Sequence, residues 1–294
     1  MEVSIIIVSY NTCDLLRNCL ISIYRQTQDI EFEVIVVDND SKDRSQDMLE
    51  NEFPQVKLVA SQENLGFGKA NNLGMARAAG KYLFFLNSDT LLQNNAVKLF
   101  YDYCRSTNEK VGALGTILRN ANGSNIHSYG KFITLKSELK ELTAKYLRFL
   151  KDKETHHPED VSFSKEVDYI TGADLFVPRY VYEELGGFDP RFFMYCEEVD
   201  WQRRMMEAGY KRIIIPGPEI VHLEGGSDVA SSTVWSANRL KNIYESKRLY
   251  LEKYNRGLKY KSFRVAYIIL RIPVIIILMF VKNGGGYAAL LKKI

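Results

Sequence analysis

The sequence predicts an α/β protein with a mostly parallel central sheet flanked by helices. Short runs of β-branched and aromatic residues recur along the first 115 residues, and segments with the apolar period of a helix separate them. Continuous apolar strands that alternate with helices are typical of parallel sheets covered on both faces. The expected strands are Val3–Val8, Glu33–Val37, Val56–Ala60, Lys81–Leu86 and Val111–Gly115.

Helices are expected between these strands. Asn11 or Thr12 caps the first, which reaches Arg25, and the others cover Ser41–Phe53 and Phe67–Gly80, where a glycine ends the helix. Right-handed crossovers of this kind place the carboxyl ends of the strands at one edge of the sheet. Open sheets bind their ligands along that edge.

The pattern is less regular beyond residue 115. Lys131–Lys165 is polar, with a weak helical period at Ser137–Phe149, and we expect it to form a flap over the site. Strand character returns at Val167–Val177. A helix is expected at Cys196–Ala208, a strand at Lys211–Ile215 and a further helix at Thr233–Tyr254.

The C-terminal part combines basic and apolar residues. Residues 239–264 hold nine Lys and Arg against two Glu, and Val265–Val281 is apolar except for Arg271 and Pro273. Each basic residue near an anionic membrane contributes roughly 1 kcal/mol of binding. We expect residues 239–281 to associate with an anionic membrane surface through a helix lying in the leaflet. A single membrane span and a buried core helix are the alternatives.

The composition narrows the class of protein. A formal net charge of +3 gives no global field that favours nucleic acid. The four cysteines are scattered without a C-x-x-C pair, which fits a reduced compartment. The N-terminal run has no basic region or cleavage site of a secretory signal. We therefore expect a cytoplasmic protein, peripherally associated with the inner face of the cell membrane.

Polar residues follow three of the expected strands. They would meet at one edge of the sheet, although Asp, Asn and Ser at such positions also make turns and cap helices. Asp38 and Asp89 end central apolar strands, which favours a role in the crevice for both. The three groups are Ser9-Tyr10-Asn11, Asp38-Asn39-Asp40-Ser41 and Asn87-Ser88-Asp89.

The turn after the first strand contains no glycine, and no Walker loop is present. A nucleotide's phosphates would therefore need another source of positive charge. A divalent cation held by Asp89 is the natural candidate, because hard cations bind carboxylate and phosphate oxygens.

Seven motifs, in order over residues 3–228, resemble glycosyltransferase family 2 enzymes of the GT-A type fold, and within them the bacterial rhamnosyltransferase-like branch. Each motif alone is weak, but together they are specific. They are VSYN (Val8–Asn11), VVDNDSKD (Val36–Asp43), NLGFGKANNLG (Asn64–Gly74), FLNSD (Phe85–Asp89), TGADLFVPR (Thr171–Arg179), GGFDPRFFMYCEEVDWQRR (Gly186–Arg204) and VHLEGGS (Val221–Ser227).

The resemblance implies a nucleotide-binding role for the first motifs. Asp38 would accept a hydrogen bond from the N3–H group of a uracil or thymine base. The remaining donor-binding residues would line the base, ribose and phosphates, with the glycines allowing close backbone approach. These residues are Ser9, Tyr10, Asn11, Asn39, Gly66, Gly68, Asn71, Asn87 and Ser88.

The resemblance also implies a metal site for Mg²⁺ or Mn²⁺. Asp89 matches the last aspartate of the family's D-x-D motif, and the chain departs from that motif at Asn87, where an amide replaces the first carboxylate. His222 matches a position that completes metal or diphosphate binding.

The implied general base is Glu198, with Glu197 as the alternative. Acidic residues in a first helical turn also stabilise the helix itself. Adjacent carboxylates repel, however, which raises the proton affinity of one of them. The resemblance places Asp200 in the same catalytic motif, and Asp174 and Trp201 near the sugar and acceptor.

We therefore expect an inverting glycosyltransferase that transfers a sugar from dTDP-rhamnose or a UDP-sugar to a lipid-linked glycan. Its catalytic domain would cover residues 1–230, with a nucleotide-sugar-binding half at 1–115, an acceptor half at 116–230 and a membrane-associating tail at 231–294. A nucleotidyltransferase, which would need a Gly-rich loop after the first strand, and an inert membrane-bound binding subunit are the rival classes.

Overall fold

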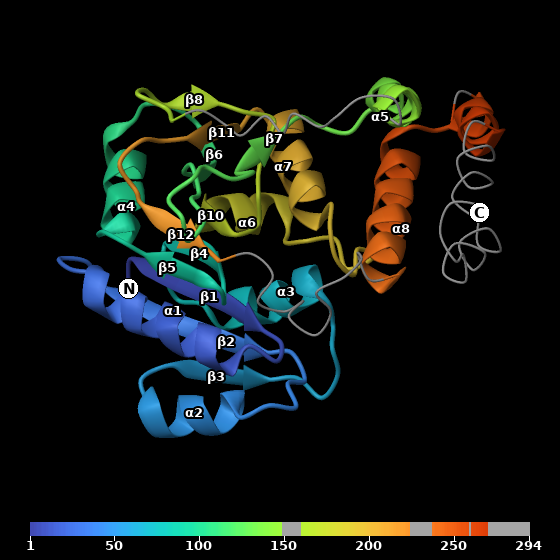
Figure 1. Cartoon of the computed structure of the whole chain (residues 1–294). Coiled ribbons are helices and arrows are strands. Elements are labelled where there is room, and N and C mark those ends of the chain that lie inside the picture. Colours follow the sequence, from blue (N-terminus) through green and yellow to red (C-terminus); the bar gives the residue numbers. More distant parts are fainter. Residues whose placement is uncertain (149–159, 224–236, 259, 270–294) are drawn as a thin grey trace. The chain divides into compact units, whose positions relative to one another are not determined.

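The computed structural model describes residues 1–148, 160–223, 237–258 and 260–269 (Figure 1). The chain divides into two compact units. The first comprises Met1–Phe132 and His157–Ser232, and the second comprises Ile133–His156 and Thr233–Ile294. Of the described residues, 133–148 therefore fall in the second unit, together with residues 237–258 and 260–269.

The first unit contains an eight-stranded sheet with the order β3-β2-β1-β4-β10-β6-β11-β8. Its first four strands are parallel and lie in the nucleotide-binding half expected from the sequence. The three central ones, Val3–Ser9, Phe32–Asp38 and Tyr82–Asn87, are apolar almost throughout because both faces of the sheet are covered there. The strands are β1 (Val3–Ser9), β2 (Phe32–Asp38), β3 (Lys57–Ala60) and β4 (Tyr82–Asn87).

The other half of the sheet is mixed. β10 (Asp174–Pro178) runs antiparallel to β4 and to β6 (Val111–Gly115), whereas β11 (Lys211–Ile214) is parallel to β6. β8 (Lys165–Glu166) is antiparallel at the edge. Because β10 is reversed, its first residues lie at the same edge as the last residues of β4. The expected class, a mostly parallel sheet with flanking helices, is confirmed.

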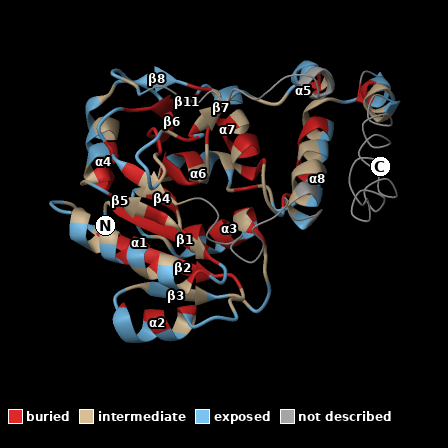
Figure 2. Ribbon diagram, viewed as in Figure 1, coloured by how far each residue is buried: buried red, intermediate tan, exposed pale blue. Residues whose placement is uncertain are grey.

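Helices cover both faces of this sheet, and two buried apolar clusters fill the layers between (Figure 2). Successive residues of β1 alternate between them: Ile5 and Ile7 pack in one cluster and Ile6 in the other. The first cluster includes residues of α1 (Cys13–Gln26), α2 (Ser45–Glu52) and α4 (Ala96–Ser106). The second includes residues of α3 (Phe67–Arg77), α6 (Arg179–Leu185) and α7 (Glu197–Glu207).

Two small antiparallel sheets complete the first unit. β5 (Thr90–Leu92) pairs with β12 (Ile220–His222), and β7 (Tyr129–Gly130) pairs with β9 (Tyr169–Ile170). The strand character expected at Val167–Val177 is divided between two strands, since residues 171–173 separate β9 from β10. Those three residues lie at the sheet edge where the expected site is.

The second unit contains α5 (Leu135–Arg148), α8 (Ala237–Tyr254) and a helix within residues 260–269. Leu135, Leu251, Tyr260 and Phe263 form its buried cluster. Among the described residues, no helix is both long and apolar enough to cross a membrane. Residues 270–281 of the expected membrane-associating segment lie outside the described part of the chain.

Candidate functional site

The carboxyl ends of the central strands bring the first predicted residues together. Ser9 lies directly opposite Asp38, and Val8 lies opposite Asn87. A chain of hydroxyl groups extends along this edge: the Ser9 and Thr12 oxygens are 2.9 Å apart, and Thr12 donates to Ser88 at 3.0 Å. The residues that follow β1, β2 and β4 therefore form one continuous polar edge.

Asp38 is fully buried, with its two carboxylate oxygens in different environments. Oδ1 accepts hydrogen bonds from the Ser41 backbone N–H at 3.1 Å and from Gln46 Nε2 at 2.8 Å. Oδ2 is buried without a hydrogen-bond partner in the described structure. Because buried polar atoms are nearly always paired in native proteins, Oδ2 is suited to accept from a bound ligand.

The loops after β1 and β2 are held to each other and to residues 64–66. The Asn11 backbone N–H donates to Ser41 Oγ at 3.0 Å, and its Oδ1 accepts from the Lys42 N–H at 2.6 Å. Asn39 Nδ2 donates to Asn64 Oδ1 at 3.0 Å, and Asn39 Oδ1 accepts from the Leu65 N–H at 2.9 Å. The Asn39 side chain is thus engaged in fixing the loop.

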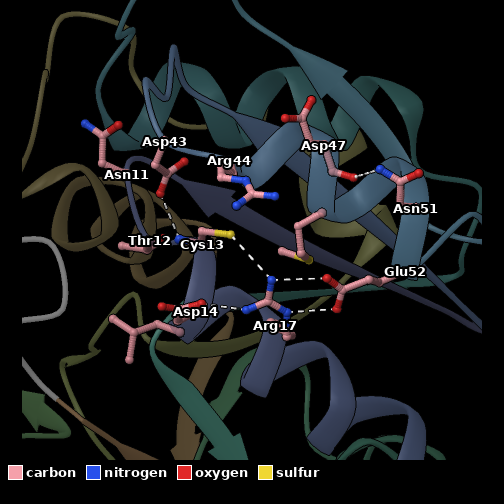
Figure 3. Close-up of a pocket in the computed structure, with 12 residues that line it drawn as sticks. Asn11, Thr12, Cys13, Asp14, Arg17, Asp43, Arg44, Asp47, Asn51 and Glu52 are labelled. Carbon is pink, nitrogen blue, oxygen red and sulfur yellow. Dashed lines mark hydrogen bonds and ion pairs between the residues drawn. The ribbon is translucent and has the colours of Figure 1, made fainter.

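Tyr10 lies at the rim, with 41% of its side chain exposed. A cavity of about 770 Å³ opens beside the same loop, between the N-terminal part of α1 and the length of α2 (Figure 3). One wall carries Asp43, whose Oδ2 accepts from the Cys13 N–H and whose Oδ1 accepts from Ser45. Asp43 therefore caps both helices.

Asp89 and His222 meet where β5 pairs with β12. His222 Nε2 lies 3.1 Å from Asp89 Oδ1 and 3.3 Å from Asn87 Nδ2. The pairing of His222 with Thr90 and the hydrogen bond from the Leu223 N–H to the Asp89 carbonyl at 2.9 Å fix this arrangement. Both side chains are partly accessible. The predicted neighbourhood of Asn87, Asp89 and His222 is thus present.

Asp89 and His222 could supply two of the coordinating atoms of a divalent cation, and a bound nucleotide would have to supply others. A carboxylate oxygen and an imidazole nitrogen can both coordinate Mn²⁺ or Mg²⁺. Among the described residues, no group of three or more His, Cys, Asp and Glu could hold a metal ion. The protein would therefore supply few ligands, and the phosphates of a nucleotide would supply others.

Gly66 and Gly68 were expected to allow close approach of a nucleotide. In the structure, the segment that lies against them is residues 188–197 of the protein itself. A side chain at Gly66 would overlap the Phe193 carbonyl oxygen, which accepts from the Phe67 N–H at 2.9 Å. A Cβ atom at Gly68 would lie 3.4 Å from the Cβ of Glu197. The first turn of α3 is therefore packed against the loop that leads into α7.

Asn71 is buried on α3, where its amide donates to the Phe67 carbonyl at 3.0 Å. This contact is within its own helix, one turn back. In the structure the Asn71 amide group is thus bonded to the protein rather than directed to solvent.

Glu197 and Glu198 begin α7, directly after Tyr195 and Cys196, which both adopt left-handed backbone angles. Burial raises the pKa of Glu198 to about 7. Burial, and then the neighbouring charge of Glu198, raise the pKa of Glu197 well above its usual range. One carboxylate oxygen of each, Oε2, is buried without a hydrogen-bond partner. A carboxylate with a pKa near neutrality can accept a proton at the working pH.

The segment between β9 and β10 joins this pair to the sheet edge. The Asn87 N–H donates to the Ala173 carbonyl at 3.1 Å, and a Cβ atom at Gly172 would lie 3.9 Å from that of Glu198. Asp174 is fully buried, and its Oδ2 accepts from the Thr116 N–H at 2.7 Å. Burial raises the pKa of Asp174 well above its usual range.

Asp200 and Trp201 face the interior. Asp200 pairs with Arg204 at 3.1 Å, and Arg204 also donates to the Leu185 and Gly187 carbonyls. The Trp201 ring is 0% exposed and packs against Phe188, with ring centroids 4.7 Å apart. The structure does not bring Trp201 to a surface where a sugar could stack on it.

Four residues that shape the site were not predicted to belong to it. Thr12 links Ser9 to Ser88, and Gly172 lies against Glu198. Asn72 forms two hydrogen bonds with the Phe188 backbone, at 2.9 and 3.0 Å. Gln202 does the same with Ile170. Polar residues at apolar positions of a helical period were the available signal for Asn72 and Gln202.

The chain is similar in sequence to two rhamnosyltransferases. The chain is 28% identical over 243 residues to the N-acetylglucosaminyl-diphospho-decaprenol L-rhamnosyltransferase of Mycobacterium tuberculosis, an alignment covering 77% of this chain and 78% of the relative. It is 24% identical to the rhamnosyltransferase WbbL of Escherichia coli, over 75% of this chain and 83% of the relative.

Solved structures share the fold. TarS 1–349 of S. aureus covers 91% of this chain and 79% of its own, with a TM-score of 0.55 and 14% identity. GalNAc-T7, solved with UDP, GalNAc and Mn²⁺, covers 91% of this chain and 54% of its own, with a TM-score of 0.56 and 16% identity. The expected GT-A type fold is therefore confirmed at the level of architecture.

The sequence profile of glycosyl transferase family 2 matches residues 4–165, which include the ends of β1, β2 and β4 and the polar edge they form. The profile covers more than half of the chain, and the rhamnosyltransferases align over most of it. The protein is a transferase, and it belongs to glycosyl transferase family 2.

Proposed function

We propose that the protein transfers a sugar, with inversion, from a nucleoside-diphosphate donor to a hydroxyl of a lipid-linked glycan in cell-surface polysaccharide synthesis. The observation that carries the proposal is Glu198, a carboxylate with a pKa of about 7 beside the polar edge of the sheet. The two aligned rhamnosyltransferases favour dTDP-rhamnose as donor, and UDP-sugars are the alternative.

The pyrimidine base would be held by Asp38. Its buried Oδ1 is fixed by Ser41 and Gln46, so Oδ2 has a fixed position and no competing partner in the described structure. An oxygen that only accepts matches the N3–H donor of uracil or thymine. Ser9, Tyr10 and the loop held by Asn39 would line the rest of the nucleoside.

The diphosphate would lie near Asp89 and His222. These residues, with Asn87 beside them, would hold Mg²⁺ or Mn²⁺. When bound, the cation stabilises the negative charge of the departing nucleoside diphosphate.

Glu198 would remove the proton from the acceptor hydroxyl as its oxygen bonds to the anomeric carbon. The bond from that carbon to the diphosphate oxygen breaks in the same step, and the nucleoside diphosphate carries the electron pair away. A single base on one face of the sugar produces inversion. Asp200 would act by orienting α7 through its ion pair with Arg204.

The second unit supports the proposed membrane association. Leu258, Val265 and Ile269 are exposed to 79%, 58% and 60%, beside the basic residues of 239–264. Exposed apolar side chains next to basic ones suit an interfacial segment on anionic lipid. Sedimentation with vesicles tests this: binding to phosphatidylserine vesicles but not to phosphatidylcholine vesicles is expected, and no binding to either contradicts it.

The function is tested by a donor screen that measures nucleoside diphosphate release and transferred sugar, with dTDP-rhamnose and UDP-sugars, a polyprenyl-diphosphate-linked acceptor and Mn²⁺. Turnover of one donor by the wild-type protein and its loss in Glu198→Gln are expected. Full transfer by Glu198→Gln would remove Glu198 from the role of base.

A further inference from the structure

The side-chain amide of Gln202 forms hydrogen bonds with both the backbone N–H and the backbone carbonyl of Ile170. Its Oε1 accepts from the Ile170 N–H at 2.8 Å, and its Nε2 donates to the Ile170 carbonyl at 2.7 Å and to the Glu198 carbonyl at 3.2 Å. Gln202 is 0% exposed. A buried side-chain amide thus replaces a neighbouring strand for Ile170, the last residue of β9.

This pair of hydrogen bonds joins the helix of the proposed base to the segment that covers it. Ile170 is followed by Thr171, Gly172 and Ala173, and Gly172 lies beside both Glu198 and the ring of Phe67. Gln202 is one helical turn after Glu198, so its contact fixes the distance between α7 and residues 171–173. Those residues form one wall of the Glu198 environment.

Glu198 gains its proton affinity from burial, since a desolvated carboxylate is less stable than the neutral acid. The titratable group next to it on α7 is Glu197. Asp174 lies two residues beyond Gly172 in the chain and is fully buried. On α3 the Phe67 ring, which does not titrate, lies against Gly172, and Lys69 on that helix is exposed.

We propose that Gln202 is a positioning residue for Glu198: its two-point bond to Ile170 holds residues 171–173 against the carboxylate and keeps water away from it. The inference rests on the proposed function for its consequence in catalysis. The positioning itself is a property of the fold and can be measured without turnover.

Two substitutions at this position are expected to move the proton affinity of Glu198 in opposite directions. Gln202→Met keeps the volume and removes both bonds, so the wall loosens, water enters and the pKa of Glu198 falls by about one unit. Gln202→Glu keeps an acceptor for the Ile170 N–H but adds a carboxylate beside Glu198, so the pKa of Glu198 rises by about one unit.

The control is Ser4→Ala. Ser4 is also 0% exposed and makes two buried hydrogen bonds, to Glu33 at 2.6 Å and from the Gly80 N–H at 2.8 Å, but it lies at the opposite end of β1. Ser4→Ala should lower the unfolding free energy of the protein while the pKa of Glu198 stays the same. A purely structural role for Gln202 predicts the Ser4→Ala behaviour.

Two measurements decide the inference. Hydrogen exchange of the residues 169–174 amides should accelerate at least tenfold in Gln202→Met and not in Ser4→Ala. The pKa of Glu198, obtained from the difference in unfolding free energy with pH between each protein and its Glu198→Gln partner, should fall in Gln202→Met and rise in Gln202→Glu. The acid limb of kcat/KM should follow the same directions.

Unchanged exchange at residues 169–174, or an unchanged pKa of Glu198 in both variants, would overturn the positioning role. The proposed function fails separately, if the wild-type protein transfers no sugar from any donor while the exchange and titration results hold.

Discussion

The imidazole of His222 lies 3.1 Å from the carboxylate of Asp89, although β12 and the turn after β4 are far apart in the chain. The three-residue pairing of β5 with β12 produces this contact. A hard cation bound there would have one oxygen and one nitrogen ligand from the protein, with the diphosphate supplying more.

Asp89→Ala and His222→Ala test this pair. Loss of the carboxylate should reduce kcat by about 10² to 10³-fold, because the charge of the leaving group is then poorly compensated. Loss of the imidazole should raise the Mn²⁺ concentration for half-maximal activity about 10- to 100-fold. Activity titrations with Mn²⁺ measure both effects, and identical Mn²⁺ curves for the wild-type protein and both variants would contradict the assignment.

Asp38→Asn tests whether Asp38 recognises the pyrimidine base of the nucleotide. The asparagine oxygen can keep the bonds from Ser41 and Gln46, which places its NH₂ group where Oδ2 is now. Two donors would then face each other in a complex with uracil. Affinity for UDP and dTDP should fall about 10- to 100-fold, or ~1.4 to 2.8 kcal/mol.

CDP provides the control in the same calorimetric titration, because N3 of cytosine is an acceptor. Its affinity should fall less than that of UDP or should increase. An equal loss for UDP and CDP would show that Asp38 does not distinguish the bases.

Gly66→Ala tests the contact between α3 and the loop before α7. The new Cβ overlaps the Phe193 carbonyl oxygen at a positive φ of 77°, so both crowding and backbone strain follow. Gly123→Ala is a matched control, with a φ of 78° and no atom within 4 Å of the added Cβ.

Strain alone should cost Gly123→Ala about 1 kcal/mol of unfolding free energy. Gly66→Ala should lose at least about 2 kcal/mol more, comparable to overpacking in a core. Urea denaturation of both variants measures the difference. Equal losses in the two proteins would mean that α3 is not held tightly against Phe193.

Asp174→Asn tests the buried carboxyl beside Ala173. The pKa of Asp174 is raised by burial, so the folded state holds this proton more tightly than the unfolded state does. The contribution of the Asp174 carboxyl to the unfolding free energy is therefore largest below the pKa of about 3.9 that it has in the unfolded state. This contribution is lost as the pH rises towards the pKa of Asp174 in the folded state. An amide has no such dependence.

The unfolding free energy of Asp174→Asn should therefore decrease less between pH 5 and pH 8 than that of the wild-type protein. Urea denaturation at the two pH values provides the comparison. The same decrease in both proteins would place the ionisation of Asp174 outside this range.

The architecture of the sheet was predictable because its central strands are buried on both faces and therefore apolar throughout. Ser9, Asp38 and Asn87 were predictable for the same reason, since each ends such a strand. Asp89 and His222 could be paired only through the family resemblance, because β5 and β12 have three residues each and too little pattern to identify.

Side-chain direction was harder to predict. The motif around Glu198 does not show which residues of α7 face the core, and Trp201 packs against Phe188. Gly66 and Gly68 indicate a close approach, but only the packing shows that residues 188–197 approach them. The grouping of residues 133–148 with the second unit depends on long-range packing, such as the cluster that Leu135 shares with Leu251 and Tyr260.

The central claim is that Glu198 accepts the proton of the acceptor hydroxyl, and the pH dependence of kcat/KM for the wild-type protein and Glu198→Gln tests it most directly. We expect an acid limb with a midpoint near pH 7 in the wild-type protein. In Glu198→Gln the rate should fall about 10² to 10⁴-fold and the limb should disappear. A variant that keeps the wild-type rate, or the same limb, would contradict the account.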